Sequence, residues 1–298
     1  MTRALLFALS LVLALPAQAQ TIDISDIPAL PDGFERSGTG GAPRDVVLLG
    51  TDLVEIAVAL GAADRLLARP ASTTVDGVED TPHQMREFAG IEGIAALRPA
   101  LVVASNQRFE RLLAGLSAIK INNHLVDRIL PATEKVRRMA ELLGEEARGA
   151  DLIAAIEADF AKANSITRSD QPLKLLHVSK QGAGGNFSAG GAATGVDNLI
   201  RRVGAENAAA GIGMDRYRSV TPEGVIMMAP DVVLISEAEL PAFGNLDGIW
   251  SDYPGLALTP AGREKRLIIL RDMHVRGDAA SAGIATVALA QALAEMFP

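Results

Sequence analysis

The sequence predicts an α/β protein with two lobes, each built on a parallel-type sheet, joined by one long α-helix. Short apolar runs alternate with amphipathic helical segments along most of the chain. One helical segment near the middle contains neither Gly nor Pro after Gly149, and a helix–Pro–strand pattern occurs once in each half. We expect an N-terminal lobe at residues 45–144, a linking helix at 145–166 and a C-terminal lobe at 167–298.

The N-terminal lobe begins with an apolar run, 45–49, that ends at Gly50 and is typical of a buried strand in a parallel sheet. Thr51 can cap the following helix, whose apolar residues recur on one face. The same alternation predicts further strands at 101–104 and 119–121, and helices at 109–116 and 132–143.

The linking helix is predicted from Leu152, Ile153, Ile156 and Phe160, which form one apolar stripe. After it, strands are expected at 174–178, 231–235 and 267–270, and helices at 196–203 and 281–296. The glycine-rich run 190–195 lacks the spacing of a dinucleotide loop, so we interpret it as a turn before a helix.

The two halves share an internal pattern that indicates equivalent lobes. In the first half, Glu92 and Pro99 bracket a short helical segment before the apolar run 100–104. In the second half, Glu223 and Pro230 have the same spacing before the run 231–235. Each copy reads as a short helix, a Pro that ends it, and a buried strand.

The composition excludes several classes of function. The chain has 298 residues, 49% of them hydrophobic, and a formal net charge of −8, so a nucleic-acid binder is not expected. It contains no Cys, which rules out disulfides, thiolate nucleophiles and Cys-ligated metals. Hydrolase, metalloprotease and phosphate-loop motifs are absent from the sequence, so we expect neither an enzyme nor an intrinsic cofactor.

The N-terminus has the pattern of an export signal. Arg3 precedes an apolar run at 4–15, and Ala17 and Ala19 supply small residues at a signal-peptidase site. We therefore expect a signal peptide at 1–19, cleavage after Ala19 and a periplasmic mature chain; a retained membrane anchor is the alternative. Residues 20–44 are rich in Pro, Gly, Asp and Ser and predict a flexible leader with little structure of its own.

Several segments resemble a known family. The segment 50–66 resembles the opening lobe of periplasmic binding proteins of iron-chelate, cobalamin and haem ABC importers. The segments 195–209, 217–223 and 253–263 resemble the haem-binding branch, and the resemblance runs from Asp45 to the C-terminus. It implies two lobes with a ligand cleft between them, capture of haem as the transported ligand, and delivery to an ABC transporter permease in the inner membrane by a monomer. Cobalamin or a ferric siderophore is the alternative ligand. A secreted enzyme or a sensor is the alternative class of protein.

The cleft can be located because ligands of α/β sheets bind at the loops that follow the strands. This rule selects the segments 69–86, 180–188, 214–218 and 272–277. The basic residues among them suit an anionic ligand such as the propionates of haem, although ordinary solvated charges are an alternative reading. The candidate cleft residues are Thr73, Thr74, Arg86, Lys180, Tyr217 and Arg276.

The ligand of the haem iron is a separate question. The resemblance implies a tyrosine just after the Ser/Thr-rich stretch 71–74, but Val75 stands there and cannot ligate iron. We consider His274 first, His83 second and Tyr217 third. The alternative is that no side chain ligates the iron.

The resemblance also implies one surface glutamate on each lobe that pairs with arginines of the permease. Glu92 and Glu223 match these positions. Alternatively, each is only a favourable charge near a helix N-terminus.

Overall fold

The computed structural model describes residues 20–34, 43–86, 90–166, 171–181, 186–253 and 255–298. The expected signal peptide at 1–19 lies outside the described residues. Within the described part of the chain, no helix has the length and apolar character needed to cross a membrane.

The first lobe contains a five-stranded, wholly parallel sheet in the order β4-β3-β2-β5-β6. The two central strands are fully buried, as their apolar runs predict. One face of the sheet packs against α1 and α4, and the other against α2 and α3. The elements are β2 (Val46–Leu49), α1 (Thr51–Ala59), β3 (Leu66–Pro70), β4 (His83–Met85), α2 (Ile91–Ala96), β5 (Leu101–Ala104), α3 (Glu110–Ala118), β6 (Asn123–Leu125) and α4 (Ala132–Leu143).

The second lobe contains a sheet in the order β1-β12-β11-β7-β8-β10, with β9 beside β7. Strands β8 and β10 run antiparallel to their neighbours, so this sheet is mixed at one end. Helices α6 and α12 pack on one face, and α7 to α10 on the other. The elements are β1 (Thr21–Asp23), β7 (Lys174–Gln181), β8 (Asn186–Gly190), α6 (Gly195–Arg202), β9 (Glu206–Asn207), α7 (Ala208–Gly211), β10 (Tyr217–Ser219), α8 (Pro222–Met228), β11 (Val232–Ser236), α9 (Leu246–Asp252), α10 (Pro260–Glu264), β12 (Leu267–Leu270), α11 (Asp272–Arg276) and α12 (Ala282–Met296).

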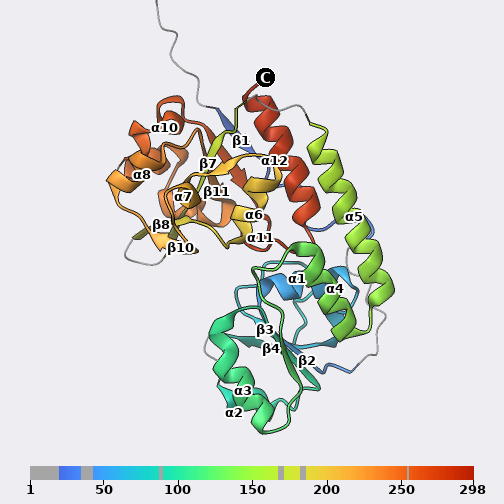
Figure 1. The fold of residues 1–298 in the computed structure, drawn as a ribbon. Coiled ribbons are helices and arrows are strands. Elements are labelled where there is room, and N and C mark those ends of the chain that lie inside the picture. Colours follow the sequence, from blue (N-terminus) through green and yellow to red (C-terminus); the bar gives the residue numbers. More distant parts are fainter. Residues whose placement is uncertain (1–19, 35–42, 87–89, 167–170, 182–185, 254) are drawn as a thin grey trace, which may run out of the picture.

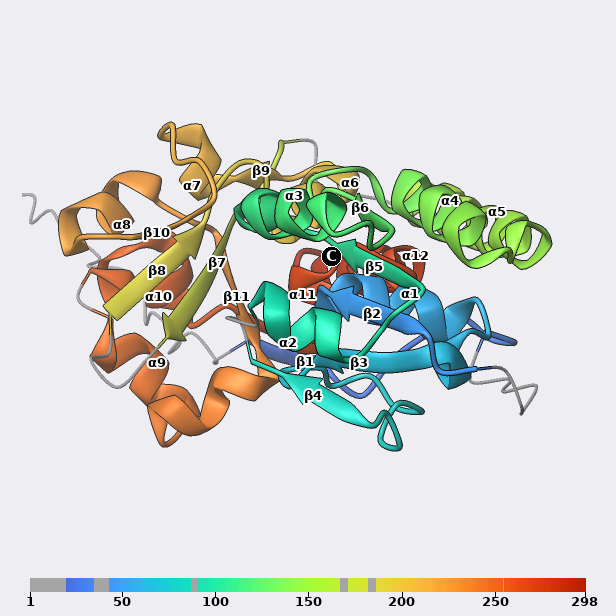
Figure 2. The same ribbon diagram turned by 90° about the horizontal axis from the view of Figure 1, so that it is seen from below.

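Helix α5 (Glu146–Asn164) runs along both lobes (Figure 1) and packs against α4 of the first lobe and α12 of the second. Figure 2 shows α4 and α5 lying together at one end of the molecule. Two glycines allow these close helix contacts. A Cβ on Gly149 would lie 2.4 Å from the Cβ of Ala140, and one on Gly283 would lie 2.8 Å from the Cβ of Asp159.

The N-terminal leader differs from its expectation. Residues 20–44 were expected to have little structure, but Thr21–Asp23 form β1, which pairs in parallel with β12. Ile22 and Ile24 pack against the second-lobe core, and Leu30 is buried in the first-lobe core. These apolar residues explain why the segment 21–30 is held against the two lobes. From β1 in the second lobe, the described chain reaches the first lobe by Leu30, and it returns to the second lobe along α5.

Three local elements also differ from expectation. The strand expected at 119–121 is instead a turn after α3, with Lys120 at a φ of 61°, and the strand β6 follows it. Gly50, and not Thr51, is the N-cap of α1. The segment 272–276, expected as a cleft loop, forms helix α11.

The repeated pattern of the two halves forms equivalent elements. Helix α2 leads through Pro99 into the central strand β5, and α8 leads through Pro230 into the central strand β11.

Candidate functional site

A cavity of about 420 Å³ lies between the lobes at the carboxyl ends of the first-lobe strands. Its lining mixes apolar residues with polar and charged side chains, which come from the segments after all five first-lobe strands and from α11. The loops after β2 and β5 meet closely, because a Cβ on Gly50 would lie 2.1 Å from Oγ of Ser105. The lining residues are Leu49, Gly50, Thr51, Asp52, Pro70, Ala71, Ser72, Met85, Arg86, Ser105, Asn106, Arg108, Phe109, Arg128 and Arg276.

A second cavity of about 240 Å³ adjoins the first and shares Asn106 and Arg128 with it. The second lobe contributes the turn before α6, together with Arg216 and Tyr217. Asp127 lines this cavity and accepts a hydrogen bond from Nε2 of Gln107 at 2.7 Å. Together the two cavities form one cleft that both lobes line.

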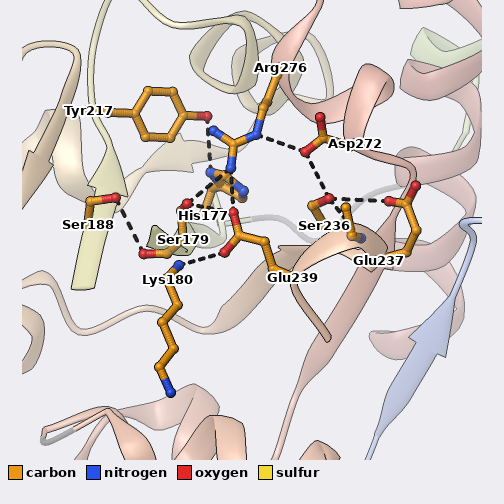
Figure 3. Close-up of polar contacts among 11 residues, drawn as sticks. His177, Ser179, Lys180, Ser188, Tyr217, Ser236, Glu237, Glu239, Asp272 and Arg276 are labelled. Atoms are coloured by element: carbon orange, nitrogen blue, oxygen red, sulfur yellow. Dashed lines mark hydrogen bonds and ion pairs between the residues drawn. The ribbon is translucent and has the colours of Figure 1, made fainter. Parts of the chain in front are cut away.

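The cleft is rich in arginine, but its arginines are not equivalent. Arg276 of the second lobe forms ion pairs with Glu239 and with Asp272 (Nε to Oδ1, 2.8 Å), and it donates a hydrogen bond to Oγ of Ser179 at 3.0 Å (Figure 3). Its charge is therefore compensated within the protein.

The first lobe supplies three exposed arginines to the cleft, whereas the exposed Arg216 of the second lobe lies 3.6 Å from Oδ2 of Asp215. Arg86, Arg108 and Arg128 line the larger cavity with exposed side chains. Asp52, the carboxylate in the same lining, lies 3.4 Å from Nζ of Lys135. An anionic group entering the cleft would therefore meet the first-lobe arginines.

Tyr217 lies beside Arg276 at the second-lobe wall. Its hydroxyl is 3.2 Å from Nδ1 of His177, and the guanidinium carbon of Arg276 is 5.3 Å from its ring centroid (Figure 3). Burial raises the pKa of Tyr217 to about 12, although the positive charge of Arg276 opposes the shift. Burial, and then Arg276, lower the pKa of His177 well below its usual value, so its imidazole is neutral.

This fold and cleft match a known family. A family model for periplasmic binding proteins matches residues 46–273 of the chain. The chain belongs to the periplasmic binding protein family. Membership places this binding protein in the periplasm, and the family and its structural neighbours are binding proteins and not enzymes.

Solved structures extend the comparison. The periplasmic heme-binding protein RhuT from Roseiflexus sp. RS-1, in apo form, is 30% identical with a TM-score of 0.74, over 85% of this chain and 99% of that chain. The periplasmic heme-binding protein BhuT in complex with two hemes is 29% identical with a TM-score of 0.72, and the match covers 84% of this chain and 97% of that chain. The periplasmic Heme binding protein HutB of Vibrio cholerae is 24% identical with a TM-score of 0.70, and the match covers 85% of this chain and 98% of that chain. At this identity the likeness supports the fold only. No curated protein sequence matches the chain significantly.

The expectation for His274 as a cleft residue is wrong. His274 is only 3% exposed, its ring lies by the backbone of Pro28 and Ala29, and it lines neither cavity. Arg276 lines the cleft from α11, and Asp272, one turn earlier, lies on the same side of the helix and pairs with it. His274 is two positions from each and therefore lies on the opposite side of the helix. Burial lowers the pKa of His274 to about 4.

His83, the second choice, is exposed on the edge strand β4 and lines neither cavity. Two residues further along, Met85 reaches the larger cavity because it lies at the carboxyl end of the strand. Of the three side chains considered as iron ligands, Tyr217 is the one that lines the cleft.

Lys180 also lies away from the cleft. Side chains alternate along β7, so Ser179 faces Arg276 while Lys180 points away from it (Figure 3). The ammonium of Lys180 is 3.0 Å from Oδ2 of Asp252 and 3.1 Å from the carbonyl oxygen of Ala242.

The Ser/Thr-rich stretch lies at the border of the cleft. Ser72 lines the larger cavity, whereas Thr73 and Thr74 line a smaller one of about 30 Å³ between the lobes. Thr73 donates its hydroxyl to the carbonyl oxygen of Pro70 at 2.8 Å. Val75 is buried in the first-lobe core.

Sequence reasoning missed the cleft residues that follow β5 and β6, among them Arg108 and Arg128. The signal was present, because the strand at 101–104 was predicted and the strand-end rule applies equally to the loop after it. Arg128 was obscured by the misplacement of the short strand β6.

Glu92 and Glu223 lie outside the cleft. Each is exposed in the first turn of its helix, α2 and α8 respectively. Both helices lie on the side of their lobes away from α5 (Figures 1 and 2).

Proposed function

We propose that this binding protein captures haem in the cleft between its lobes and delivers it to the permease of an ABC transporter. The observation that carries the proposal is the 30% identity to the periplasmic heme-binding protein RhuT over 99% of that chain. BhuT, at 29% identity, is a second haem binder that supports it.

The cleft has the chemistry that haem requires. Leu49, Met85 and Phe109 offer apolar surface for the porphyrin, and Arg86, Arg108 and Arg128 offer guanidinium groups for its two carboxylates. Arginine suits this role because its planar fork forms two parallel hydrogen bonds with one carboxylate. Arg276 would act differently. Because its guanidinium already forms ion pairs with Glu239 and Asp272, it would hold the second-lobe wall of the cleft together.

We assign Tyr217 as the first candidate for the iron ligand and Met85 as the second. A tyrosine phenolate and a methionine sulfur both ligate haem iron, and both residues line the cleft. The positive charge of Arg276 beside Tyr217 favours the phenolate form that a ferric iron would bind.

Delivery would use the outer surface of the lobes. Glu92 and Glu223 present exposed carboxylates on equivalent helices, a geometry that suits simultaneous contact with cations of a membrane partner. Cleavage after Ala19 during export, and action as a monomer, complete the proposal.

The experiment is an absorbance titration of the purified protein with ferric haem, with cobalamin and a ferric siderophore as competitors. We expect a saturable Soret band that neither competitor displaces. Tyr217→Phe should shift the Soret and charge-transfer bands, whereas Met85→Leu should leave them in place. A protein that takes up cobalamin or the siderophore but not haem would overturn the assignment of the ligand.

A further inference from the structure

Three buried ionisable side chains lie where the first lobe meets the α11–α12 connection of the second. Asp52 and Glu55 come from α1 and are 7% and 2% exposed, and Lys135 comes from α4 and is 0% exposed. The cluster therefore holds two carboxyl groups and one ammonium. If both carboxyls ionised, one negative charge would remain uncompensated in a place that water barely reaches.

The ammonium ties the two lobes together. Nζ of Lys135 donates to the carbonyl oxygen of Gly277, the C-cap of α11, at 2.8 Å. It also lies 3.4 Å from Oδ2 of Asp52 and 3.4 Å from the carbonyl oxygen of Arg128. Its donors are therefore engaged by Asp52 and by two carbonyl groups.

Glu55 makes the second tie. Its Oε1 accepts a hydrogen bond at 2.7 Å from the backbone N–H of Ser281, the N-cap of α12. A first-lobe carboxyl thus caps a 15-residue second-lobe helix. In the part of the chain that the structure describes, Glu55 forms no salt bridge, because the nearest cation, Lys135, is turned to Asp52 and Gly277.

The other charges at this interface do not compensate Glu55. Asp272 and Arg276 of α11 line the same cavity of about 30 Å³ as Glu55, but they pair with each other. Asp278, in the connection to α12, is paired with Arg202 at 2.5 Å. Consistent with this geometry, burial raises the pKa of Glu55 to about 7, against the opposing effects of the Ser281 hydrogen bonds and of Lys135.

The packed interface therefore gives Glu55 a higher affinity for a proton than a hydrated carboxyl has. If water entered between the lobes, the carboxyl of Glu55 would return toward its ordinary acidity. By linkage, the packed state, which has the higher affinity for the proton, becomes less favoured relative to the hydrated state as pH rises through neutrality. Deprotonation should therefore favour separation of α1 from the α11–α12 connection.

We propose that Asp52, Glu55 and Lys135 form a proton-sensitive latch between the lobes, which holds the cleft at its present opening while one proton is bound and loosens when that proton is lost. The latch acts on the cleft directly, because Asp52 and Arg276 line the larger cavity. It requires no particular ligand, so it can be tested on the ligand-free protein whether or not haem is the cargo.

The experiment places one spin label on each lobe and measures the distance between them by pulsed electron paramagnetic resonance. The measurement is made at about pH 5.5 and about pH 8.5, which lie on either side of the range in which a carboxyl with a pKa near neutrality titrates. The chain has no native Cys, so Ala118→Cys on α3 and Ala257→Cys in the second lobe, both at exposed positions, label single sites. We expect the labelled wild type to show a longer and broader distance distribution at the higher pH. Glu55→Gln, which carries the neutral form permanently, should keep the low-pH distribution at both values.

The matched control is Glu157→Gln, which removes an exposed carboxyl from α5 and should behave as wild type. A wild-type distribution that does not change with pH, or a Glu55→Gln distribution that changes as the wild type does, would overturn the latch. If Glu55→Gln does not fold, infrared spectroscopy of the wild type decides. A carboxylic-acid C=O band that disappears as pH rises through neutrality supports the latch, and its absence at the lower pH refutes it.

Discussion

At the scale of single residues, the cleft separates arginines that hold the protein together from arginines available to a ligand. Arg276 has carboxylate partners within its own lobe, whereas Arg86 and Arg128 present exposed side chains to the cavity. If only the number of positive charges were considered, all three arginines would be expected to bind an anionic ligand equally well. The distinction depends on Glu239, which pairs with Arg276 but is distant from it in the sequence. No motif in the sequence indicated this pairing.

Arg86→Ala and Arg128→Ala should each weaken ferric haem binding by roughly tenfold, because each removes a charge-assisted hydrogen bond worth about 1.5–3 kcal/mol in general, part of which water replaces. The dissociation constant from a Soret titration measures the effect. Arg111→Ala, on the exposed face of α3, is the control and should bind as wild type does. Unchanged affinity in both cleft variants would show that these arginines do not contact the ligand.

His274 should make the fold sensitive to acid. Its pKa is about 4 in the folded state and about 6.5 in the unfolded chain. Between these two values the unfolded chain is protonated at His274 and the folded chain is not. The stability from this residue is complete above about pH 6.5 and is lost as pH falls toward 4, by up to about 3 kcal/mol. Denaturant unfolding across this range should give a smaller pH slope for His274→Leu than for wild type. The exposed His124→Gln is the control, and equal slopes in His274→Leu and wild type would contradict the account.

At the scale of elements, most of the fold could be predicted from apolar periodicity. The strand at 101–104, the helix at 132–143 and the strand at 267–270 were predicted at their observed bounds. Their residues are either continuous apolar runs or clear amphipathic stripes, and burial decides such segments locally. The strand β6 was misplaced because its sequence, Asn-His-Leu, has no apolar run, whereas the preceding turn contains two isoleucines.

Other elements depend on tertiary partners that periodicity does not reveal. β1 is three residues long and exists because β12 offers it a parallel edge. α11 is a five-residue helix whose direction decides that Arg276 faces the cleft and His274 does not. The candidate site was therefore only partly predictable: the strand-end rule located the loops, but helix direction and strand alternation selected the side chains.

Removing β1 should destabilise the second lobe. A chain that begins at Asp26 lacks Ile22 and Ile24, which pack against the second-lobe core, and about 1 kcal/mol for each half-buried isoleucine gives a loss of about 2 kcal/mol. Chemical denaturation against a chain that begins at Gln20 measures the difference. Equal stability of the two chains would mean that β1 and Ile24 contribute nothing to the fold.

At the scale of the whole molecule, the part of the chain that the structure describes passes between the lobes through the segment between β1 and β2 and again through α5. The cleft opens between the lobes, while the exposed glutamates of α2 and α8 lie on the outer surface. The proposed ligand cleft and the proposed docking glutamates therefore lie on separate surfaces.

This separation predicts the behaviour of the double variant Glu92→Ala with Glu223→Ala. Haem affinity should equal that of wild type, because neither residue lines the cleft, whereas haem uptake by cells that depend on this importer should be lost. Comparing a Soret titration with uptake of labelled haem separates the two functions. Normal uptake by the double variant would refute the docking role, and reduced affinity would show that the two surfaces are not independent.

The central claim is that haem lies in the cleft between the lobes, and an iron anomalous-difference map of crystals grown with ferric haem tests it most directly. The account predicts an iron peak inside the cavities lined by Met85, Arg128 and Tyr217. A well-ordered complex whose iron lies on the outer surface of either lobe, or crystals from haem-saturated protein with no iron peak in the cleft, would contradict it.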